Sequence, residues 1–250
     1  LEVNTGNDDL GVRQVQDVNG NWISIEADGT TVQGTYGELA VDLDGGWTYT
    51  LTGNTTDHDG VNQTGTDDQV QDAFQVRATD DEGDVSDEAT LTVDINDDGP
   101  VAADDDGITQ TQENAPVIVD VFANDTAGAD GVDLASGVAL VAGSLTGNGS
   151  LAYNNDGTFT YTPAAGEEGD VSFDYTITDG DDDTSTATAT LSLQDDSTPT
   201  INVVQAEGDD GVVSESALPS GSGSGDLTTG GTLEVNTGND DLGVRQVQDV

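Results

Sequence analysis

The chain has 250 residues, and its 51 acidic and 3 basic side chains give a formal net charge of −48. A charge this large opposes compaction through self-repulsion and excludes nucleic acid or an anionic membrane surface as a partner. The absence of cysteine excludes disulfides, thiolate metal sites and cysteine nucleophiles. No apolar run approaches the ~18 residues of a membrane span, so we expect no membrane insertion.

The surplus of carboxylates needs a counter-charge if the chain is to fold. High net charge favours disorder, but the strand patterning described next argues for a folded chain. Hard carboxylate oxygens prefer calcium or magnesium over the transition metals. In a domain without disulfides, a bound metal can take over their stabilising role. The composition therefore predicts Ca²⁺ as the cofactor, although residue types alone leave magnesium open.

Apolar and polar residues alternate along the chain in short segments. The alternation runs through residues 47–52, 89–95, 158–162, 171–177 and 187–193, with threonine frequent at the polar positions. A period of two over such lengths is typical of antiparallel strands that are covered on one face. No segment shows a sustained helical period. We predict an all-β fold of tandem immunoglobulin-like, cadherin-like antiparallel β-sandwiches in an extended arrangement.

An internal repeat defines the organisation of the chain. Residues 233–250 read LEVNTGNDDLGVRQVQDV and are identical to residues 1–18, an offset of 233 − 1 = 232 residues. Near-identical tandem units suit a spacer whose value lies in number and length. We expect the chain to contain one unit and the start of the next within a longer protein.

Two acidic, proline-containing joints divide the unit, at residues 93–107 and 193–201. We predict a β-sandwich at 1–98 that lacks its first strand, a complete β-sandwich at 99–196, and the start of the next copy at 197–250. The missing strand would lie in the preceding copy, so we expect residues 200–215 to be an unpaired strand. Such open edges predict head-to-tail self-association of the fragment.

Acidic segments that are distant in sequence are expected to meet at the first joint. The linker 94–98 adjoins the incoming domain, and the loops 123–133 and 178–183 lie at the same end of a sandwich of this topology. Without a cation these carboxylates would repel one another, and with one they would lock two rigid bodies together. The predicted metal ligands are Asp94, Asn96, Asp97, Asp98, Asp125, Asp130, Asp133, Asp179, Asp181 and Asp183.

Further candidates lie elsewhere, and turn chemistry is the alternative explanation for all of them, because Asp, Asn and Gly dominate turns. The first module has an equivalent loop with Asp80, Glu82 and Asp84, and Glu113, Asp195 and Asp196 would serve the far joint. A long loop with Asp57, Asp59, Asp67 and Asp68 faces the linker at 94–98. We interpret His58 as a solvated loop residue, and Trp22 and Trp47 as core or edge packing. The segment GNDDLG at residues 6–11 resembles a single calcium β-roll repeat, an architecture that requires consecutive copies.

The linker VDINDDGP resembles a known family. Asp94, Asn96 and Asp97 match the DxND linker of cadherin-like repeats, in which those positions hold interdomain calcium. The segments TQENAPVIVDVFANDT, NNDGTFTYTP and FDYTITDGDDDTSTATATLSL make the second module similar to the cadherin-like or Ig-like repeats of large repeats-in-toxin (RTX) adhesins. The first module, with GTYGELAVDLDGGWTYTL, resembles the VCBS repeats of the same proteins.

The resemblance implies the extender region of a giant, type I-secreted adhesin on the surface of a Gram-negative cell. Its repeats would contact neighbouring repeats of the same chain and project a ligand-binding tip for cell adhesion and biofilm formation. The leading hypothesis is a calcium-rigidified spacer, and the main alternative is a carbohydrate- or surface-binding module. An acidic halophilic protein that needs bulk salt is a third possibility. We predict no enzyme, because the sequence has no nucleophile–base pair, histidine cluster or phosphate loop.

Overall fold

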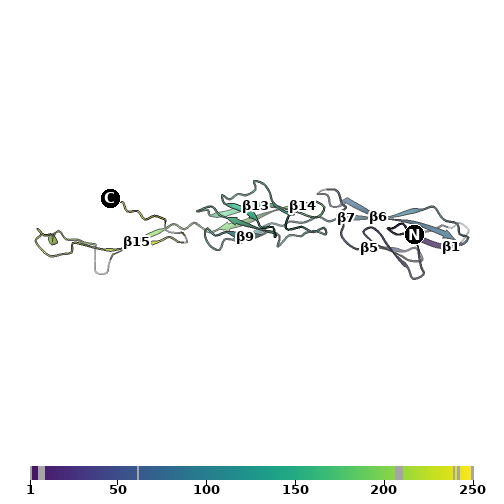
Figure 1. Cartoon of the computed structure of the whole chain (residues 1–250), viewed down its shortest axis with the longest axis horizontal. Helices are drawn as coiled ribbons and strands as arrows, with labels where there is room; N and C mark the ends of the chain where they lie inside the picture. Colours follow the sequence, from purple (N-terminus) through teal and green to yellow (C-terminus); the bar gives the residue numbers. More distant parts are fainter. Residues whose placement is uncertain are drawn as a thin grey trace.

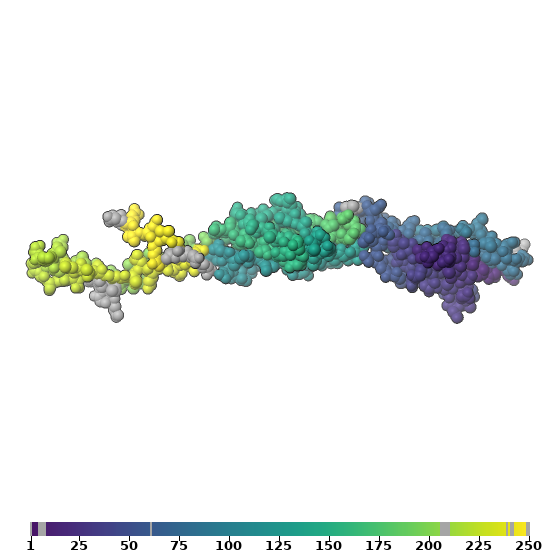
Figure 2. Space-filling view, in the orientation of Figure 1, coloured from purple at the N-terminus to yellow at the C-terminus, as the bar shows by residue number. Residues whose placement is uncertain are grey.

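The computed structural model of the chain describes residues 2–4, 9–60, 62–205, 211–238, 240 and 243–248. Two β-sandwiches follow one another along a single long axis, and a two-stranded hairpin extends beyond the second (Figure 1). The space-filling view shows the same rod-like outline (Figure 2). The predicted fold class of tandem, extended immunoglobulin-like sandwiches is confirmed. Within the described residues, no helix has the length and apolar character needed to cross a membrane.

The first sandwich, called module 1 below, has two sheets. One has the order β2-β1-β6-β7, and the other has the order β3-β4-β5. Its strands are β1 (Leu10–Gln16), β2 (Trp22–Ser24), β3 (Thr30–Gln33), β4 (Gly37–Val41), β5 (Trp47–Leu51), β6 (Gly65–Asp80) and β7 (Ala89–Asp97).

The core of module 1 is small and centres on Val15, Leu39 and Phe74, each at most 1% exposed. The buried carboxylate of Asp72 in β6 accepts the hydroxyl proton of Tyr49 in β5 at 3.0 Å, so it ties the two sheets together. Such a bond satisfies a carboxylate that burial would otherwise make costly.

The two tryptophans of module 1 occupy the edges of its sheets. Trp47 begins the edge strand β5 and is 45% exposed. Trp22 in the edge strand β2 is half-buried, and the guanidinium carbon of Arg77 lies 4.0 Å from its ring centroid. Trp22 matches the predicted edge packing and makes a cation–π contact, whereas Trp47 lies on an edge strand and is exposed.

The second sandwich, called module 2 below, contains sheets of order β10-β13-β14-β8 and β11-β12-β9. The pairing between β8 and β14 is parallel, so the sheets of module 2 are not purely antiparallel. Its strands are β8 (Asp105–Thr109), β9 (Val117–Asp120), β10 (Val138–Leu140), β11 (Ser150–Tyr153), β12 (Thr158–Thr162), β13 (Gly169–Thr178) and β14 (Thr184–Leu193).

The alternation predicted for module 2 is confirmed by its core. Phe159, Tyr161, Phe173 and Tyr175 are each at most 1% exposed, while Thr160 and Asp174, the residues between them, are half-buried on the opposite face. Burying such aromatic side chains contributes about 1.5–3 kcal/mol each relative to leaving them exposed. Module 2 therefore has the larger aromatic core, and the loops at its ends are anchored on it.

The C-terminal segment forms a hairpin of β15 (Thr200–Gln205) and β16 (Gly231–Asn236), with a short 3₁₀ helix at Glu215–Ala217 between them. The expectation that residues 200–215 form an unpaired strand is wrong for residues 200–205, because β16 pairs with them antiparallel, with Val203 opposite Leu233. The partner residues 233–236 repeat residues 1–4, so the start of the next copy supplies this strand. Residues 206–210 lie outside the described residues. The domain limits at 98 and 196 remain a prediction.

Candidate metal centre

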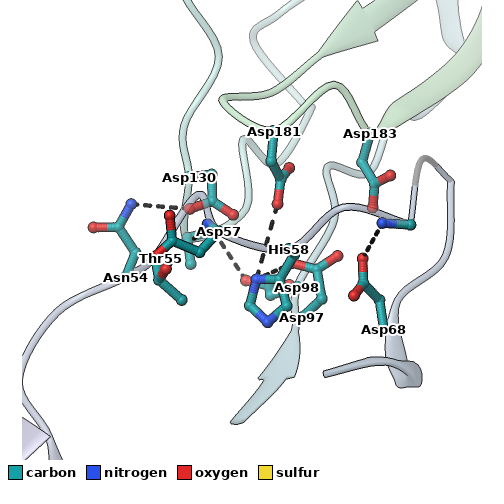
Figure 3. A network of polar contacts seen from close by, with 12 residues as sticks. Asn54, Thr55, Asp57, His58, Asp68, Asp97, Asp98, Asp130, Asp181 and Asp183 are labelled. Atoms are coloured by element: carbon teal, nitrogen blue, oxygen red, sulfur yellow. Dashed lines mark hydrogen bonds and ion pairs between the residues drawn. The ribbon is translucent and has the colours of Figure 1, made fainter. Parts of the chain in front are cut away.

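Four segments meet where module 1 joins module 2, and we call this place the first joint. They are the end of β7 at Asp97, the β13–β14 loop at 179–183, the module 2 loop at 123–133, and the module 1 loop at 52–64. Figure 3 shows Asp181 and Asp183 projecting from module 2 toward Asp97 and the 52–64 loop. The predicted convergence of the linker with the two module 2 loops is present in the structure for Asp97, Asp130, Asp179, Asp181 and Asp183.

Hydrogen bonds between the modules hold these segments together. The backbone N–H of Asn62 donates to Asp183, and the side-chain oxygen of Asn62 accepts from the N–H and the hydroxyl of Thr184 at 3.0 and 2.6 Å. Asn62 has φ +59°, a left-handed conformation that asparagine tolerates better than most residues. The amide of Asn54 donates to Asp130 at 3.0 Å. The 52–64 loop thus bridges module 1 to module 2.

The carboxylates of the first joint are buried. The side chains of Asp97 and Asp181 are 1% and 3% exposed, and Asp183 and Asp179 are 3% and 8% exposed as whole residues. Among the described residues, both oxygens of Asp97 and of Asp181, and one oxygen each of Asp179 and Asp183, have no hydrogen-bond partner. A buried ionised carboxylate without a partner is strongly unfavourable. These oxygens fit a divalent cation, which would satisfy several of them at once.

Burial also shifts the acidity of these groups. Desolvation raises the pKa of Asp97 to about 6, and the neighbouring carboxyls of Asp183 and Asp181 add to the increase. Desolvation raises the pKa of Asp179 to about 7, with further contributions from Asp181 and Asp183. Crowded carboxyls of this kind disfavour the ionised form. In the absence of metal, the joint is therefore prone to take up protons near neutral pH.

Two groups at the first joint have the spacing of metal ligands. Asp130, Asp179 and Asp181 offer carboxylate oxygens that all lie within 4.8 Å of one another. Asp97 and Asp181 lie within the same limit of each other and of a ring nitrogen of His58. Asp181 belongs to both groups, so it occupies the centre of the arrangement. The first group is all-oxygen, which is the ligand type that calcium prefers.

Most of the predicted linker ligands point elsewhere. Alternation along β7 places Asp94 and Asn96 on its exposed side, where they accept hydrogen bonds from the side-chain amides of Gln71 and Gln69. Asp98 is exposed and accepts the N–H of Ala129 at 3.0 Å. Only Asp97 from the linker therefore faces the buried cluster.

The other predicted ligands of the module 2 loop also have local partners. Asp125 accepts hydrogen bonds from the N–H of Ala103 at 2.8 Å and from the Tyr175 hydroxyl. The exposed Asp133 accepts from Ala135 and Ser136, which lowers its pKa. The structure thus holds both aspartates apart from the two ligand groups.

The interpretation of His58 as a solvated residue is wrong, because it is 7% exposed and lies in the first joint. The 52–64 loop folds back over β7, so that Nε2 of His58 lies 3.2 Å from the carbonyl oxygen of Ile95. Nδ1 lies 3.3 Å from Asp97 and 3.9 Å from Asp181. The sequence signal available was a lone histidine among aspartates in a loop that faces the linker.

The equivalent loop of module 1 shows turn geometry. Asp80 accepts the backbone N–H groups of Glu82, Gly83 and Asp84 at 3.1, 2.9 and 2.8 Å. Glu82 and Asp84 are exposed. A single carboxylate that caps three amides of its own turn is the usual Asx arrangement.

A second, looser acidic group lies where module 2 meets the hairpin, and we call this place the second joint. Glu113, Asp196 and Asp240 offer oxygens within 4.8 Å of one another, and Glu113 accepts the N–H of Ser197 at 2.9 Å. Glu113 is buried, but Asp196 is exposed, and Asp195 lies outside the group. Sequence reasoning missed Asp240, although it belongs to the repeated GNDDLG segment, and that repetition was the available signal.

Residues 96–192 match the sequence family described as "Bacterial Ig domain". The matched segment corresponds to module 2, so this part of the chain is similar to a bacterial Ig domain. No curated protein matches the chain.

Several solved structures align with the chain at low similarity. The human desmocollin-1 ectodomain is 13% identical, with a TM-score of 0.31, and the alignment covers 77% of this chain and 34% of that one. Drosophila N-cadherin EC1–4 is 12% identical, with a TM-score of 0.33 and coverages of 76% and 42%. A Bacteroides ovatus protein, SGBP-B, solved with a mixed-linkage heptasaccharide, is 14% identical, with a TM-score of 0.20 and coverages of 78% and 41%. The chain spans less than half the length of each of these structures.

Proposed function

We propose that this chain is a calcium-rigidified extender of a secreted bacterial surface adhesin. Neighbouring tandem repeats of the same protein are its immediate partners, and together they project a ligand-binding tip for cell adhesion and biofilm formation. The chain has a structural role and no catalytic one. The resemblance of its linker to cadherin-like repeats, and of its modules to VCBS and RTX adhesin repeats, supports a type I-secreted protein of a Gram-negative cell.

One observation carries the proposal. Carboxylate oxygens from two segments, the end of β7 and the β13–β14 loop, are buried without hydrogen-bond partners at the first joint, between two modules that hydrogen bonds also link. Asp130, Asp179 and Asp181 supply the all-oxygen group. These three ligands all belong to module 2, so a calcium ion there would neutralise the repulsion and order the module 2 side of the joint. Module 1 packs against that side and is linked to it by the hydrogen bond from Asn54 to Asp130, so ordering it would stiffen the joint. Extracellular modules bind calcium with Kd values on the order of 10⁻⁴–10⁻³ M.

The test compares thermal melting in calcium at about 100 times Kd, on the order of 10–100 mM, with melting in sodium chloride of equal ionic strength. At free calcium about 100 times Kd, one site that forms only in the folded state adds about 2.7 kcal/mol. For domains of this size that corresponds to roughly 10 °C in Tm. Small-angle scattering should show a longer, stiffer particle in calcium than in chelator. Equal melting and equal length in both solutions would refute the proposal, and a gain in sodium chloride alone would indicate a halophilic protein.

A carbohydrate- or surface-binding module is the second candidate. The exposed Trp47 on the edge strand β5 is the observation that favours it, since aromatic faces stack on sugars. Exact tandem duplication argues for spacing over recognition. Glycan-array binding that Trp47→Ala abolishes would support this candidate over the extender.

We also propose that chains of this length associate head to tail. Residues 233–236 pair with β15, and residues 1–4 have the same sequence, so the β15 counterpart of a preceding copy would pair there. A cavity of about 360 Å³, lined by residues such as Val3, Val76 and Leu91, lies beside that segment. Light scattering should report a concentration-dependent increase in mass, and a monodisperse monomer at high concentration would contradict this arrangement.

A further inference from the structure

His58 is the one histidine of the chain, and its surroundings differ from those of a loop residue in water. Its side chain is 4% exposed and lies between Asp97 at the end of β7 and Asp181 of the β13–β14 loop (Figure 3). The imidazole comes from module 1, and Asp181 comes from module 2. Any ion held by these groups would therefore connect the two modules.

The hydrogen bond of one ring nitrogen defines the state of the other. Nε2 lies 3.2 Å from the carbonyl oxygen of Ile95, and a carbonyl only accepts, so Nε2 carries the proton. In the neutral imidazole, Nδ1 is then the nitrogen with the free lone pair. A histidine whose other N–H donates to a backbone carbonyl is the common arrangement of a metal ligand.

Nδ1 is buried and makes no hydrogen bond in the described structure. It faces Asp97 Oδ1 at 3.3 Å and Asp181 Oδ2 at 3.9 Å, and the oxygens of both carboxylates also have no hydrogen-bond partner. A lone pair that faces two carboxylates is favourable only with a cation between them, either a metal ion or a proton on Nδ1. Ligand atoms about 3.3–3.5 Å apart are what tetrahedral bonds of roughly 2.0–2.1 Å to one ion produce. The distance from Nδ1 to Asp97 fits this range, and Asp181 would have to move closer by about 0.4–0.6 Å to join the same ion.

We infer that His58 Nδ1, Asp97 and Asp181 form a second metal position at the first joint, selective for a nitrogen-preferring divalent ion such as Zn²⁺. Imidazole favours zinc and its neighbours in the transition series, whereas calcium takes oxygen ligands. The inference deepens the proposed function, since Asp181 would be shared between this position and the all-oxygen group. Zinc would then stiffen the same joint that calcium stiffens, through a different set of atoms.

The decisive variant is His58→Gln. The side-chain amide of glutamine can replace Nε2–H as the donor to Ile95, but it places no nitrogen at the position of Nδ1. Zinc is titrated into the full chain by calorimetry with excess magnesium present, so that weak carboxylate sites are occupied. We expect one zinc site in the wild type that is weakened at least tenfold in His58→Gln, because loss of even an outer-shell partner costs about 10–100-fold. Asp106→Asn, at an exposed position outside both joints, should leave that affinity unchanged.

Two readouts keep the zinc position separate from the calcium proposal. The calcium-dependent gain in Tm should persist in His58→Gln. If neither the wild type nor His58→Gln melted higher in calcium, calcium rigidification would be refuted, but the zinc measurement would remain a valid test of the zinc position. Zinc-edge X-ray absorption of the wild-type chain should show scattering from one imidazole, and this measurement needs no variant. Equal zinc affinity in His58→Gln, or an absorption spectrum of oxygen ligands only, would overturn the inference. In that case a proton on Nδ1 would be the cation that the two carboxylates share.

Discussion

The two joints of this chain use the same residue types and differ in how the structure surrounds them. At the first joint, Asp97 and Asp181 are nearly inaccessible, and their oxygens have no hydrogen-bond partner. At the second joint, Asp196 is exposed, although burial and the neighbouring Glu113 and Asp240 still raise its pKa. The difference follows from what each joint connects. Two sandwiches meet end to end at the first, whereas a sandwich meets an isolated hairpin at the second (Figure 1).

The contrast teaches that acidic composition alone does not define a metal centre. Repulsion among carboxylates in water is weak, because solvent screens it. We expect the same carboxylates to bind a cation strongly only where two folded bodies exclude water from them. We therefore expect the first joint to dominate every ion-dependent property of the chain, and the predictions below are ordered by the size of the effect expected.

The largest effect should come from Asp181→Asn, because Asp181 belongs to both ligand groups. In calcium the variant should lose most of the ion-dependent stabilisation, up to about 2.7 kcal/mol at 100 times Kd. In chelator the change in stability caused by the substitution should have the opposite sign. Removal of one buried charge relieves repulsion, so the variant should be more stable than the wild type by on the order of 1 kcal/mol.

Thermal melting of Asp181→Asn and of the wild type, in calcium and in chelator, measures the stability change in each solution. Asp106→Asn is the matched control, because it removes the same charge from an exposed position outside both joints. It should change neither the calcium response nor the melting in chelator by more than about 0.5 kcal/mol. A variant at Asp181 that destabilises equally in both solutions would mean that this side chain has a packing role only.

The second effect concerns pH in the absence of metal. Asp97 and Asp179 have folded-state pKa values of about 6 and about 7, against 3.8 for the unperturbed group. The folded state therefore binds more protons than the unfolded state between these values. The stabilisation is complete below pH 3.8 and is lost as pH rises through about 7, so metal-free protein should melt higher at pH 5 than at pH 8.

Saturating calcium should reduce the dependence of the melting temperature on pH, because the ion replaces the protons at the carboxylates. Other carboxyls of the chain also contribute, including Asp105, whose pKa burial raises to about 6. The contribution of the first joint is therefore read from the difference between the wild type and Asp179→Asn. If the melting temperatures of the wild type and Asp179→Asn depended on pH in the same way, the first joint would not be the cause of the pH dependence.

Features of the fold and of the first joint that follow from local sequence patterns could be predicted, and features that depend on the exact position of a single residue could not. The strands of module 2 were predictable, because alternation over 158–162 and 171–177 reports directly on burial of one face. The convergence of Asp97 with Asp179 and Asp181 was predictable too, because the ends of consecutive sandwiches must meet. The register within the linker was not, since one residue decides whether a side chain in β7 faces the cluster or the solvent.

The failures at His58 and at residues 200–205 have a common cause. His58 is buried because a loop without regular structure folds over the joint, and no periodicity signals such a fold. Residues 200–205 are paired because the repeated segment supplies β16. Predicting this pairing from the sequence would have required recognising that the repeated segment forms the partner strand. Both features depend on contacts between segments distant in sequence.

A smaller effect should follow from Asn62→Gly, which asks how much of the first joint is held without ions. Glycine keeps the left-handed backbone and the N–H that donates to Asp183. It removes the side-chain oxygen that accepts hydrogen bonds from the N–H and the hydroxyl of Thr184. Both bonds are exposed, so together they contribute about 1 kcal/mol. The loss should appear equally in calcium and in chelator. Asn155→Gly is the control, because Asn155 has φ +62° in an exposed turn of module 2.

The smallest effect should come from Glu113→Gln at the second joint. Glu113 accepts the N–H of Ser197 and approaches Asp196 and Asp240, but the hairpin beyond it has almost no buried surface to stabilise. Global melting should therefore change by no more than about 0.5 kcal/mol in either solution. Local order should respond instead, so hydrogen exchange across residues 194–205 should be slower in calcium for the wild type and independent of calcium for the variant. If Glu113→Gln lowered the melting temperature in calcium as much as Asp181→Asn does, the two joints would be equivalent, and burial between folded bodies would not be what makes these carboxylates a metal centre.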